Sequence, residues 1–389
     1  MKEKEKLKIL TDLIKIHSVN GNEFEVAKYI AALFQKKNIS VRIDRFDSNR
    51  ANLIAEIGEK RDKGVLCFTG HQDTVAVGQK DGWNYEPFSG KVVAGKIYGR
   101  GAADMKSGLA AQIITLLELV EEQHIPAGMV RFVATAGEEY GAQGAYRLND
   151  QGMMNDVAAL VVGEPTSGQV IYAHSGSLNY QIKSYGKAVH SSRPGQGVNA
   201  ISGLMQYINA EQTLFDDVPL DPLLGNVQHS ITVIKGGQQV NSIPSYAEIY
   251  GNIRPTKKFN NNQVIERIQK KIKEINRKSS FKLVFSIVHN FYPVGTLPQN
   301  WFVQLVQKIT DDEYPDREIN LRTINGATDA SVFIQSKPEI PVVILGADAW
   351  KEAHQLNEYT TVTSYLTTIQ IYKKIALNFF KQGRPVSVV

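Results

Sequence analysis

The stretch GVLCFTGHQDTV, residues 64–75, is an apolar run that passes directly into polar residues. As far as Thr69 it has the length and composition of a buried β-strand. His71 follows this strand, and Asp73 comes two residues later. Because open α/β sheets bind ligands at the carboxyl ends of their strands, the stretch predicts such a sheet with a functional histidine at its edge. Taken alone, a histidine beside a strand is more often a structural residue than a functional one.

Helical and strand patterns alternate on both sides of this stretch. Apolar residues recur at helical spacing within 7–14 and 26–34. Further helices are expected over 106–121 and 364–380, and further strands over 41–46, 52–57, 129–134, 158–162, 170–173 and 341–345. The alternation predicts an α/β fold with a mixed, mostly parallel sheet and helices on both faces.

The pattern changes between residues 178 and 289. Strand, helix, strand, strand, helix and strand are expected there, over 178–185, 197–212, 230–234, 245–253, 262–275 and 281–288. This βαββαβ order is that of a ferredoxin-like α+β unit with an antiparallel sheet. With 389 residues the chain is long enough for two cores. We therefore expect a catalytic domain formed by residues 1–177 and 290–389, and a lid domain, 178–289, inserted into it.

Composition and charge exclude several classes of function. Hydrophobic residues make up 42 % of the chain and charged residues 21 %, as in ordinary globular proteins. The net charge of +5 is small, and the lysine-rich run 270–278 is interpreted as the solvated face of one helix, so no nucleic-acid partner is expected. The single cysteine, Cys67, rules out a disulfide within the chain. Because neither a membrane span nor a signal peptide is recognisable, we expect a cytoplasmic protein without a membrane partner.

Further acidic and imidazole groups lie where ligands are expected, next to strand ends or before a helix. They are Asp104 in a glycine-rich stretch before the helix 106–121, Glu138 and Glu139 after the strand 129–134, Glu164 after 158–162, and His354 after 341–345. Taken alone, Asp104 would more simply be a helix N-cap, and the glutamate pair could equally lie on a surface loop. Together with His71, however, this mixture of imidazole and carboxylate groups suits zinc, with cobalt or manganese as replacements. One carboxylate shared between two ions would build a two-metal site and leave one glutamate as a general base.

Five motifs resemble the metal-site motifs of the aminoacylase / carboxypeptidase G / acetylornithine deacetylase / succinyl-diaminopimelate desuccinylase family of two-zinc hydrolases. They occur in the family's order as His71-Gln-Asp, Gly101-Ala-Ala-Asp-Met-Lys-Ser-Gly, Glu138-Glu139, Gly163-Glu-Pro-Thr and Ala353-His-Gln-Leu-Asn-Glu. The resemblance covers about residues 7–380 and implies two Zn²⁺ ions per subunit, for which Co²⁺ or Mn²⁺ can substitute. The implied metal ligands are His71 and Glu164 for one ion, Glu139 and His354 for the other, and Asp104 as the bridge. It further implies that Glu138 is the general base, that Asp73 orients His71, and that the Asp104–Met105 peptide bond is cis.

The same resemblance implies substrate-binding residues. His190 resembles a lid histidine that stabilises the oxyanion, often in the neighbouring subunit, so a homodimer through the lid domain is expected. Asn241 and Arg254 are expected to contact the substrate, Arg254 through a carboxylate. Gly326 and Thr328 lie in a segment that resembles a loop recognising the substrate's α-carboxylate. No role is transferred to position 175, where this chain has serine and many relatives have a basic residue.

The activity implied is hydrolysis of an amide bond in a small N-acyl amino acid by a metal-bound hydroxide, with Glu138 moving the proton. Glutamate at position 164 favours the acetylornithine deacetylase / succinyl-diaminopimelate desuccinylase branch over relatives that carry aspartate there. Two alternatives stay open. The same site would serve a dipeptidase or carboxypeptidase, and a non-catalytic binding protein of this fold is the second, although all expected ligands and Glu138 are present.

Overall fold

The computed structural model describes residues 1–61 and 64–381, which divide into two compact units. The first unit comprises Met1–Ala173, Gly295–Thr323 and the described residues from Thr328 onward. The second comprises His174–Val294 and the short segment Ile324–Ala327. The insertion expected over 178–289 thus lies within the second unit.

A mixed sheet forms the centre of the first unit. Its strands are β1 (Ser40–Arg45), β2 (Ala51–Ile57), β3 (Val65–His71), β6 (Met129–Thr135), β7 (Val157–Val162), β8 (Val170–His174), β15 (Val294–Gly295), β16 (Leu321–Ile324) and β17 (Val342–Ile344). Their order is β1-β2-β6-β3-β7-β17-β8-β15, with β16 paired to β8. The neighbours β6, β3, β7 and β17 run parallel, whereas β1–β2, β2–β6 and β17–β8 are antiparallel. This confirms the predicted α/β class.

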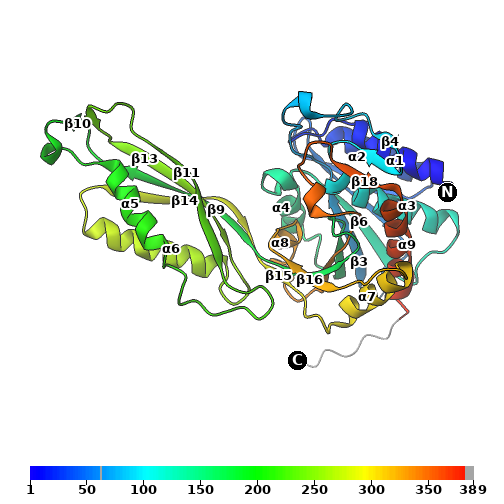
Figure 1. Ribbon diagram of the computed structural model, residues 1–389. Coiled ribbons are helices and arrows are strands. Elements are labelled where there is room, and N and C mark those ends of the chain that lie inside the picture. The colour runs from blue at the N-terminus through cyan, green and yellow to red at the C-terminus, as the bar shows by residue number, and fades with distance from the viewer. Residues whose placement is uncertain (62–63, 382–389) are drawn as a thin grey trace. The chain divides into compact units, whose positions relative to one another are not determined.

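Helices cover both faces of this sheet (Figure 1). One face is packed by α1 (Glu3–Lys15), α2 (Phe24–Gln35), α3 (Ser107–Glu121), α7 (Trp301–Glu313) and α9 (Val362–Phe379), and the other by α4 (Gln143–Asp150) and α8 (Ala330–Phe333). Leu66 and Phe68, at alternate positions of β3, belong to the hydrophobic cluster formed with the first group of helices. Because β3 is covered on both faces, all of its residues are buried, and this explains its apolar sequence.

Strand pairing beside the main sheet brings together two segments of the first unit that are far apart in sequence. The strands β4 (Lys91–Val93), β5 (Lys96–Tyr98) and β18 (Tyr359–Thr361) form a small antiparallel sheet in the order β18-β5-β4. A π-helical turn, η2 (Ala102–Lys106), follows β5, and a 3₁₀ turn, η5 (Trp350–Glu352), lies shortly before β18. The pairing of β5 with β18 therefore places segment 99–104 beside segment 354–358, although they are far apart in sequence.

The second unit has the predicted ferredoxin-like arrangement. Its main elements are β9 (Ser177–Tyr185), α5 (Ala200–Glu211), β11 (Gln228–Gly236), β13 (Tyr246–Arg254), α6 (Asn261–Arg277) and β14 (Lys282–Phe291). The four strands form an antiparallel sheet in the order β11-β13-β9-β14, and both helices lie on one face of it (Figure 1). A separate short ladder joins β10 (Val189–His190) to β12 (Ser242–Ile243).

The lysine-rich run lies on α6, as expected. The Asn260 side chain caps this helix by accepting a hydrogen bond from the backbone N–H of Gln263, and the Gln263 side chain accepts one from the backbone N–H of Asn260. Val264, Ile268 and Ile272 recur at helical spacing and are buried, so the lysines fall on the opposite, solvated side. Within the described part of the chain, no helix combines the length and apolar character needed to span a membrane.

Candidate metal centre

Strand ends and adjoining loops of the first unit bring a group of histidine and acidic side chains together. His71 ends β3, the 3₁₀ turn η3 (Glu138–Tyr140) follows β6, and Glu164 follows β7. Because β6, β3 and β7 are parallel neighbours, their carboxyl ends meet at one edge of the sheet. Asp104 in η2 and His354 before β18 reach the same place from the two segments that strand pairing holds together.

Asp104 lies at the centre of this group. The His71 Nε2 atom is 3.1 Å from Asp104 Oδ1 and 3.6 Å from Glu164 Oε1. The His354 Nε2 atom is 3.3 Å from Asp104 Oδ2 and 2.8 Å from Glu139 Oε1. Each oxygen of Asp104 thus faces one histidine, and each histidine has one glutamate beside it. The structure therefore brings together all five side chains predicted as metal ligands, in two pairs around a shared carboxylate.

The chemistry of these side chains fits a divalent cation. His71, Asp104 and Glu139 each offer a ligand atom, and these atoms lie within 4.8 Å of one another. Glu164 is only 2 % exposed, and its buried Oε2 atom has no hydrogen-bond partner among the described residues. Burial raises the pKa of Glu138, Glu139 and Glu164. Repulsion from the neighbouring carboxylates raises the pKa of each of them further. A bound cation would relieve this repulsion and satisfy the unpaired oxygen.

The carboxylates of the site favour the protonated form of both histidines. Burial alone would lower the pKa of His71, but the carboxylates of Glu164, Asp104 and Asp73 outweigh it and raise that pKa well above its usual value. Hydrogen bonds to Asp104 and Glu139 raise the pKa of His354 to about 10. For Asp104, burial opposes ionisation, yet the hydrogen bonds from both histidines keep its pKa low. Metal binding must therefore displace protons from the imidazoles.

Asp73 contacts the site in a different way from the one predicted. Its buried carboxylate accepts hydrogen bonds from the backbone N–H groups of Gly137, Glu138 and Glu139, at 2.9, 3.2 and 3.1 Å. The His71 Nδ1 atom is 2.9 Å from the Asp73 backbone carbonyl oxygen and 3.7 Å from the carboxylate. The carbonyl, not the carboxylate, is thus the hydrogen-bond partner of the imidazole. The side chain instead fixes the turn that carries Glu138 and Glu139.

The backbone around Asp104 is irregular. Gly101 has a φ of 84°, in the left-handed region that glycine adopts without a steric cost. The Asp104–Met105 peptide bond is cis, which confirms the expectation from the family resemblance.

Several residues for which the sequence predicted no role also line or support the site. Glu358 accepts hydrogen bonds from the backbone N–H groups of Ala103 and Asp104 and pairs with Arg100. Asp329 is buried and accepts a hydrogen bond of 2.5 Å from the Thr135 hydroxyl, and burial raises its pKa to about 7. Glu358 ends one quoted motif and Asp329 directly follows Thr328, so their neighbourhood in sequence was the available signal.

The predicted oxyanion and substrate residues His190, Asn241 and Arg254 of the second unit lie on strands or directly beside one. His190, in β10, is exposed, and its Nδ1 atom is 2.8 Å from the Ser192 hydroxyl. Asn241 directly precedes β12, the strand paired with β10, and its carbonyl accepts a hydrogen bond from the N–H of Ser191 at 2.9 Å. Arg254 ends β13 and is partly buried, and this burial lowers the pKa of its guanidinium. The roles given to His190, Asn241 and Arg254 stay predictions.

The two predicted α-carboxylate contacts fall in different units. Gly326 lies in the segment Ile324–Ala327 of the second unit. Thr328 belongs to the first unit and is buried, and its hydroxyl accepts a hydrogen bond from the N–H of Ala330 at 3.2 Å. Thr328 therefore takes part in starting α8, and the proposed contact with a substrate stays a prediction.

Residues 67–378 match the profile of "Peptidase family M20/M25/M40". The chain belongs to this family. It is therefore an M20-family metallohydrolase, and the resemblance seen in its motifs is confirmed. The chain is 35 % identical over 406 aligned positions to a probable succinyl-diaminopimelate desuccinylase of Staphylococcus aureus (strain N315), and the match covers 98 % of each chain.

Solved structures of other M20 proteins show the same fold. The M20 family metallo-carboxypeptidase Sso-CP2 from Sulfolobus solfataricus matches with a TM-score of 0.81 and 17 % identity, over 98 % of this chain and 100 % of that one. The Bacillus subtilis YXEP protein, a dinuclear metal binding peptidase, matches with a TM-score of 0.71 and 20 % identity, over 96 % of this chain and 97 % of that one. These likenesses confirm the α/β fold with its inserted second unit.

Proposed function

We propose that this M20-family chain is a two-metal amidohydrolase that removes the acyl group from a small N-acyl amino acid. The observation that carries the proposal is the position of Asp104. Each of its carboxylate oxygens faces one histidine, and Glu164 and Glu139 complete one pair each. A carboxylate between two imidazole–carboxylate pairs is the ligand set that two neighbouring divalent cations require.

His71 and Glu164 would hold one ion, Glu139 and His354 the other, and Asp104 would contact both. The proposed ions are Zn²⁺, with Co²⁺ or Mn²⁺ as replacements, because these metals accept both imidazole and carboxylate ligands. When bound, they supply Lewis acidity toward the amide carbonyl and the attacking water.

Glu138 is the proposed general base. It lies beside Glu139 on η3, and burial and the nearby carboxylates of Glu164 and Asp329 raise its pKa. A carboxylate with a raised pKa can take a proton from the attacking water and return it to the nitrogen of the leaving amine. The hydrogen bonds from the η3 backbone to Asp73 keep Glu138 in place for both transfers.

The substrate class is proposed from the relatives and from the second unit. The Staphylococcus aureus relative matched over both full chains is named a probable succinyl-diaminopimelate desuccinylase, which favours N-succinyl-diaminopimelate or N-acetylornithine as substrate. His190 would donate to the oxyanion, and Arg254 would pair with a substrate carboxylate. A homodimer formed through the second unit is part of the proposal. The second candidate, a dipeptidase or carboxypeptidase, is favoured by the solved neighbours named as peptidases.

A substrate panel on the zinc-loaded protein tests the proposal. It would contain N-succinyl-diaminopimelate, N-acetylornithine, other N-acyl amino acids and simple dipeptides. The Glu138→Gln variant is expected to lose about 10²- to 10⁴-fold in kcat, the usual contribution of a general base. Glu118→Gln is the matched control, because Glu118 is a buried acid on α3 that pairs with Lys6 and Lys373.

The outcomes separate the candidates. Deacylation that requires metal and Glu138 supports the proposed function, and preferential cleavage of dipeptides supports the peptidase. Full activity of Glu138→Gln would refute the assigned base. No turnover of any panel member by protein with two ions bound would refute the proposed substrate classes.

A further inference from the structure

We infer that Glu358 and Arg100 form a positioning pair for the metal centre, which fixes the backbone on both sides of the shared carboxylate of Asp104. The inference rests on the proposed two-metal function, because it assigns a task to residues that lie behind the ligands.

Glu358 holds the segment that carries Asp104. Its carboxylate is buried, with 1 % of the residue exposed. One oxygen accepts hydrogen bonds from the backbone N–H groups of Ala103 at 2.9 Å and Asp104 at 3.0 Å. The other accepts a hydrogen bond of 2.6 Å from Arg100 Nη1. The Glu358 backbone carbonyl also accepts from the N–H of Gly99 at 2.9 Å, so one residue anchors the segment at both of its ends.

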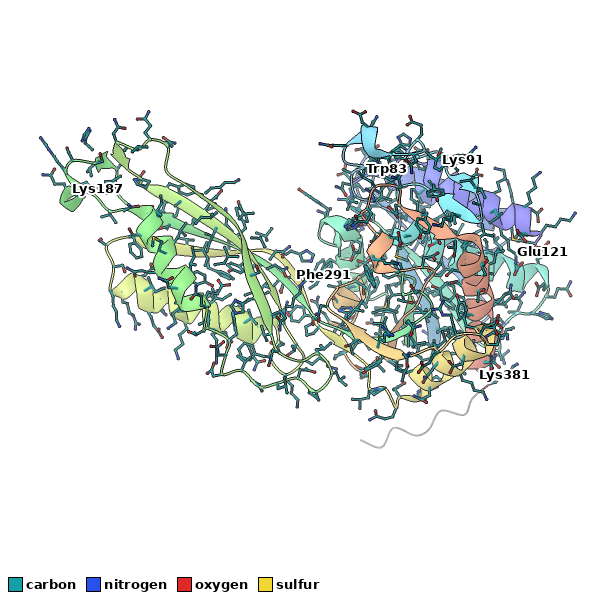
Figure 2. All side chains as sticks on the ribbon, in the orientation of Figure 1. Trp83, Lys91, Glu121, Lys187, Phe291 and Lys381 are labelled. Atoms are coloured by element: carbon teal, nitrogen blue, oxygen red, sulfur yellow. The ribbon has the colours of Figure 1, made fainter. Side chains whose placement is uncertain are left out.

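Arg100 links this anchor to the second histidine. Its Nη2 atom donates to the backbone carbonyl of His354 at 3.4 Å, while Nη1 donates to Glu358. The Arg100 side chain is only 3 % exposed, and the central carbon of its guanidinium lies 5.3 Å from the ring centroid of Trp83, which is labelled in Figure 2. Arg100 thus connects the segment that presents Asp104 with the segment that presents His354.

A buried ion pair of this kind does not owe its presence to stability alone. Removing two charges from water is costly, and apolar residues of similar volume often stabilise a fold equally well. What apolar residues cannot do is accept two successive backbone N–H bonds beside a metal ligand. Because each oxygen of Asp104 faces a different histidine, a small rotation of this segment would misplace both proposed ions at once.

Two substitutions separate positioning from bulk stability. Glu358→Gln keeps the size and one accepting oxygen but removes the charge and places an NH₂ group near the guanidinium. Arg100→Lys keeps the positive charge but loses the forked geometry that reaches both Glu358 and His354. Glu118→Gln is again the matched control, because it removes the charge of a buried, cation-paired glutamate that has no contact with the site.

Metal affinity is the deciding measurement. The metal-free full-length proteins would be titrated with Zn²⁺ against a competing chelator, and with Co²⁺ by visible absorption. Loss of outer-shell partners commonly weakens metal affinity about 10- to 100-fold. We expect a loss of this size and an altered Co²⁺ spectrum for Glu358→Gln, a similar or smaller loss for Arg100→Lys, and unchanged binding for Glu118→Gln.

The possible results are distinguishable. Unchanged zinc affinity and Co²⁺ spectrum in both site variants would overturn the inference, even if both variants unfold more easily. If Glu358→Gln does not fold, Arg100→Lys decides by the same criteria. An unmodified protein that binds two ions but hydrolyses no panel substrate would refute the proposed function and leave the positioning role intact. An unmodified protein that does not bind two ions would refute both.

Discussion

Replacing Gly108 with alanine should destabilise the first unit and weaken metal binding together. Gly108 lies in the first turn of α3, where the helix meets the backbone after β7. A Cβ atom at this position would be 1.8 Å from the carbonyl oxygen of Gly163 and 2.8 Å from its carbonyl carbon. Non-bonded atoms prefer separations of about 3.5 Å, so the two segments would have to move apart by more than about 1 Å. Gly163 precedes Glu164, and the displacement would therefore reach a proposed metal ligand.

The magnitude follows from two opposing terms. Alanine is favoured over glycine inside a helix by about 1 kcal/mol. Overpacking a core typically costs about 1–3 kcal/mol, and here the high end applies because backbone atoms, not a flexible side chain, must yield. The net expectation is a loss of about 2 kcal/mol. For a domain of this size such a loss lowers Tm by about 4–8 °C.

Thermal unfolding of the metal-free protein and zinc titration measure the two consequences. Gly195→Ala is the matched control, because a Cβ at Gly195 meets no atom within 4 Å. A Gly108→Ala variant that has the same Tm as the unmodified protein and binds zinc with the same affinity would refute the reasoning. A lower Tm with unchanged zinc affinity would show that the displacement does not reach Glu164.

The remaining predictions concern protons and the Glu138–Glu139 turn. Asp73→Asn should lower kcat about 10- to 100-fold, because an amide cannot replace both accepting oxygens, and unchanged kinetics would contradict this. His354 has a folded-state pKa of about 10, above its unfolded value, so its ion pairs should stabilise the metal-free protein fully below about pH 6.5 and be lost as the pH rises through 10. Unfolding curves of the unmodified protein and His354→Gln should therefore converge at high pH. Zinc binding should release protons, since the surrounding carboxylates raise the pKa of His71. Calorimetry in buffers of different ionisation enthalpy measures this release, and a binding enthalpy that does not depend on the buffer would contradict the prediction.

The fold was predictable because its signals are local. The apolar run of β3 reports a strand covered on both faces, and the change to a βαββαβ order marks the second unit. Ligands at strand ends were equally accessible, since His71 and Glu164 directly end or follow apolar runs. In these cases a short stretch of sequence contains both the secondary-structure element and the residue pattern that predicts it.

The contact between the supporting residues Arg100 and Glu358 was not predictable, because it is not local in sequence. Arg100 and Glu358 are 258 positions apart, and only the pairing of β5 with β18 brings them together. In a sequence, a single charge in a loop is most simply interpreted as solvated. Asp73 shows that a residue can be placed from sequence while its hydrogen bonds cannot. Its place near His71 was predicted correctly, but the choice between carbonyl and carboxylate as the imidazole's partner depends on backbone torsions that no motif specifies.

In the proposed function, reaction class and substrate choice depend on different residues. Every proposed metal ligand and the proposed base belong to the first unit, whereas His190, Asn241 and Arg254 belong to the second. Metal ions and a base act on the amide bond itself, which is the same in an acylated amino acid and in a dipeptide. Discrimination between them must therefore come from groups that contact the rest of the substrate, because only there do the molecules differ. It follows that substitutions in the metal centre should reduce turnover of all substrates alike, whereas substitution of Arg254 should change their ranking.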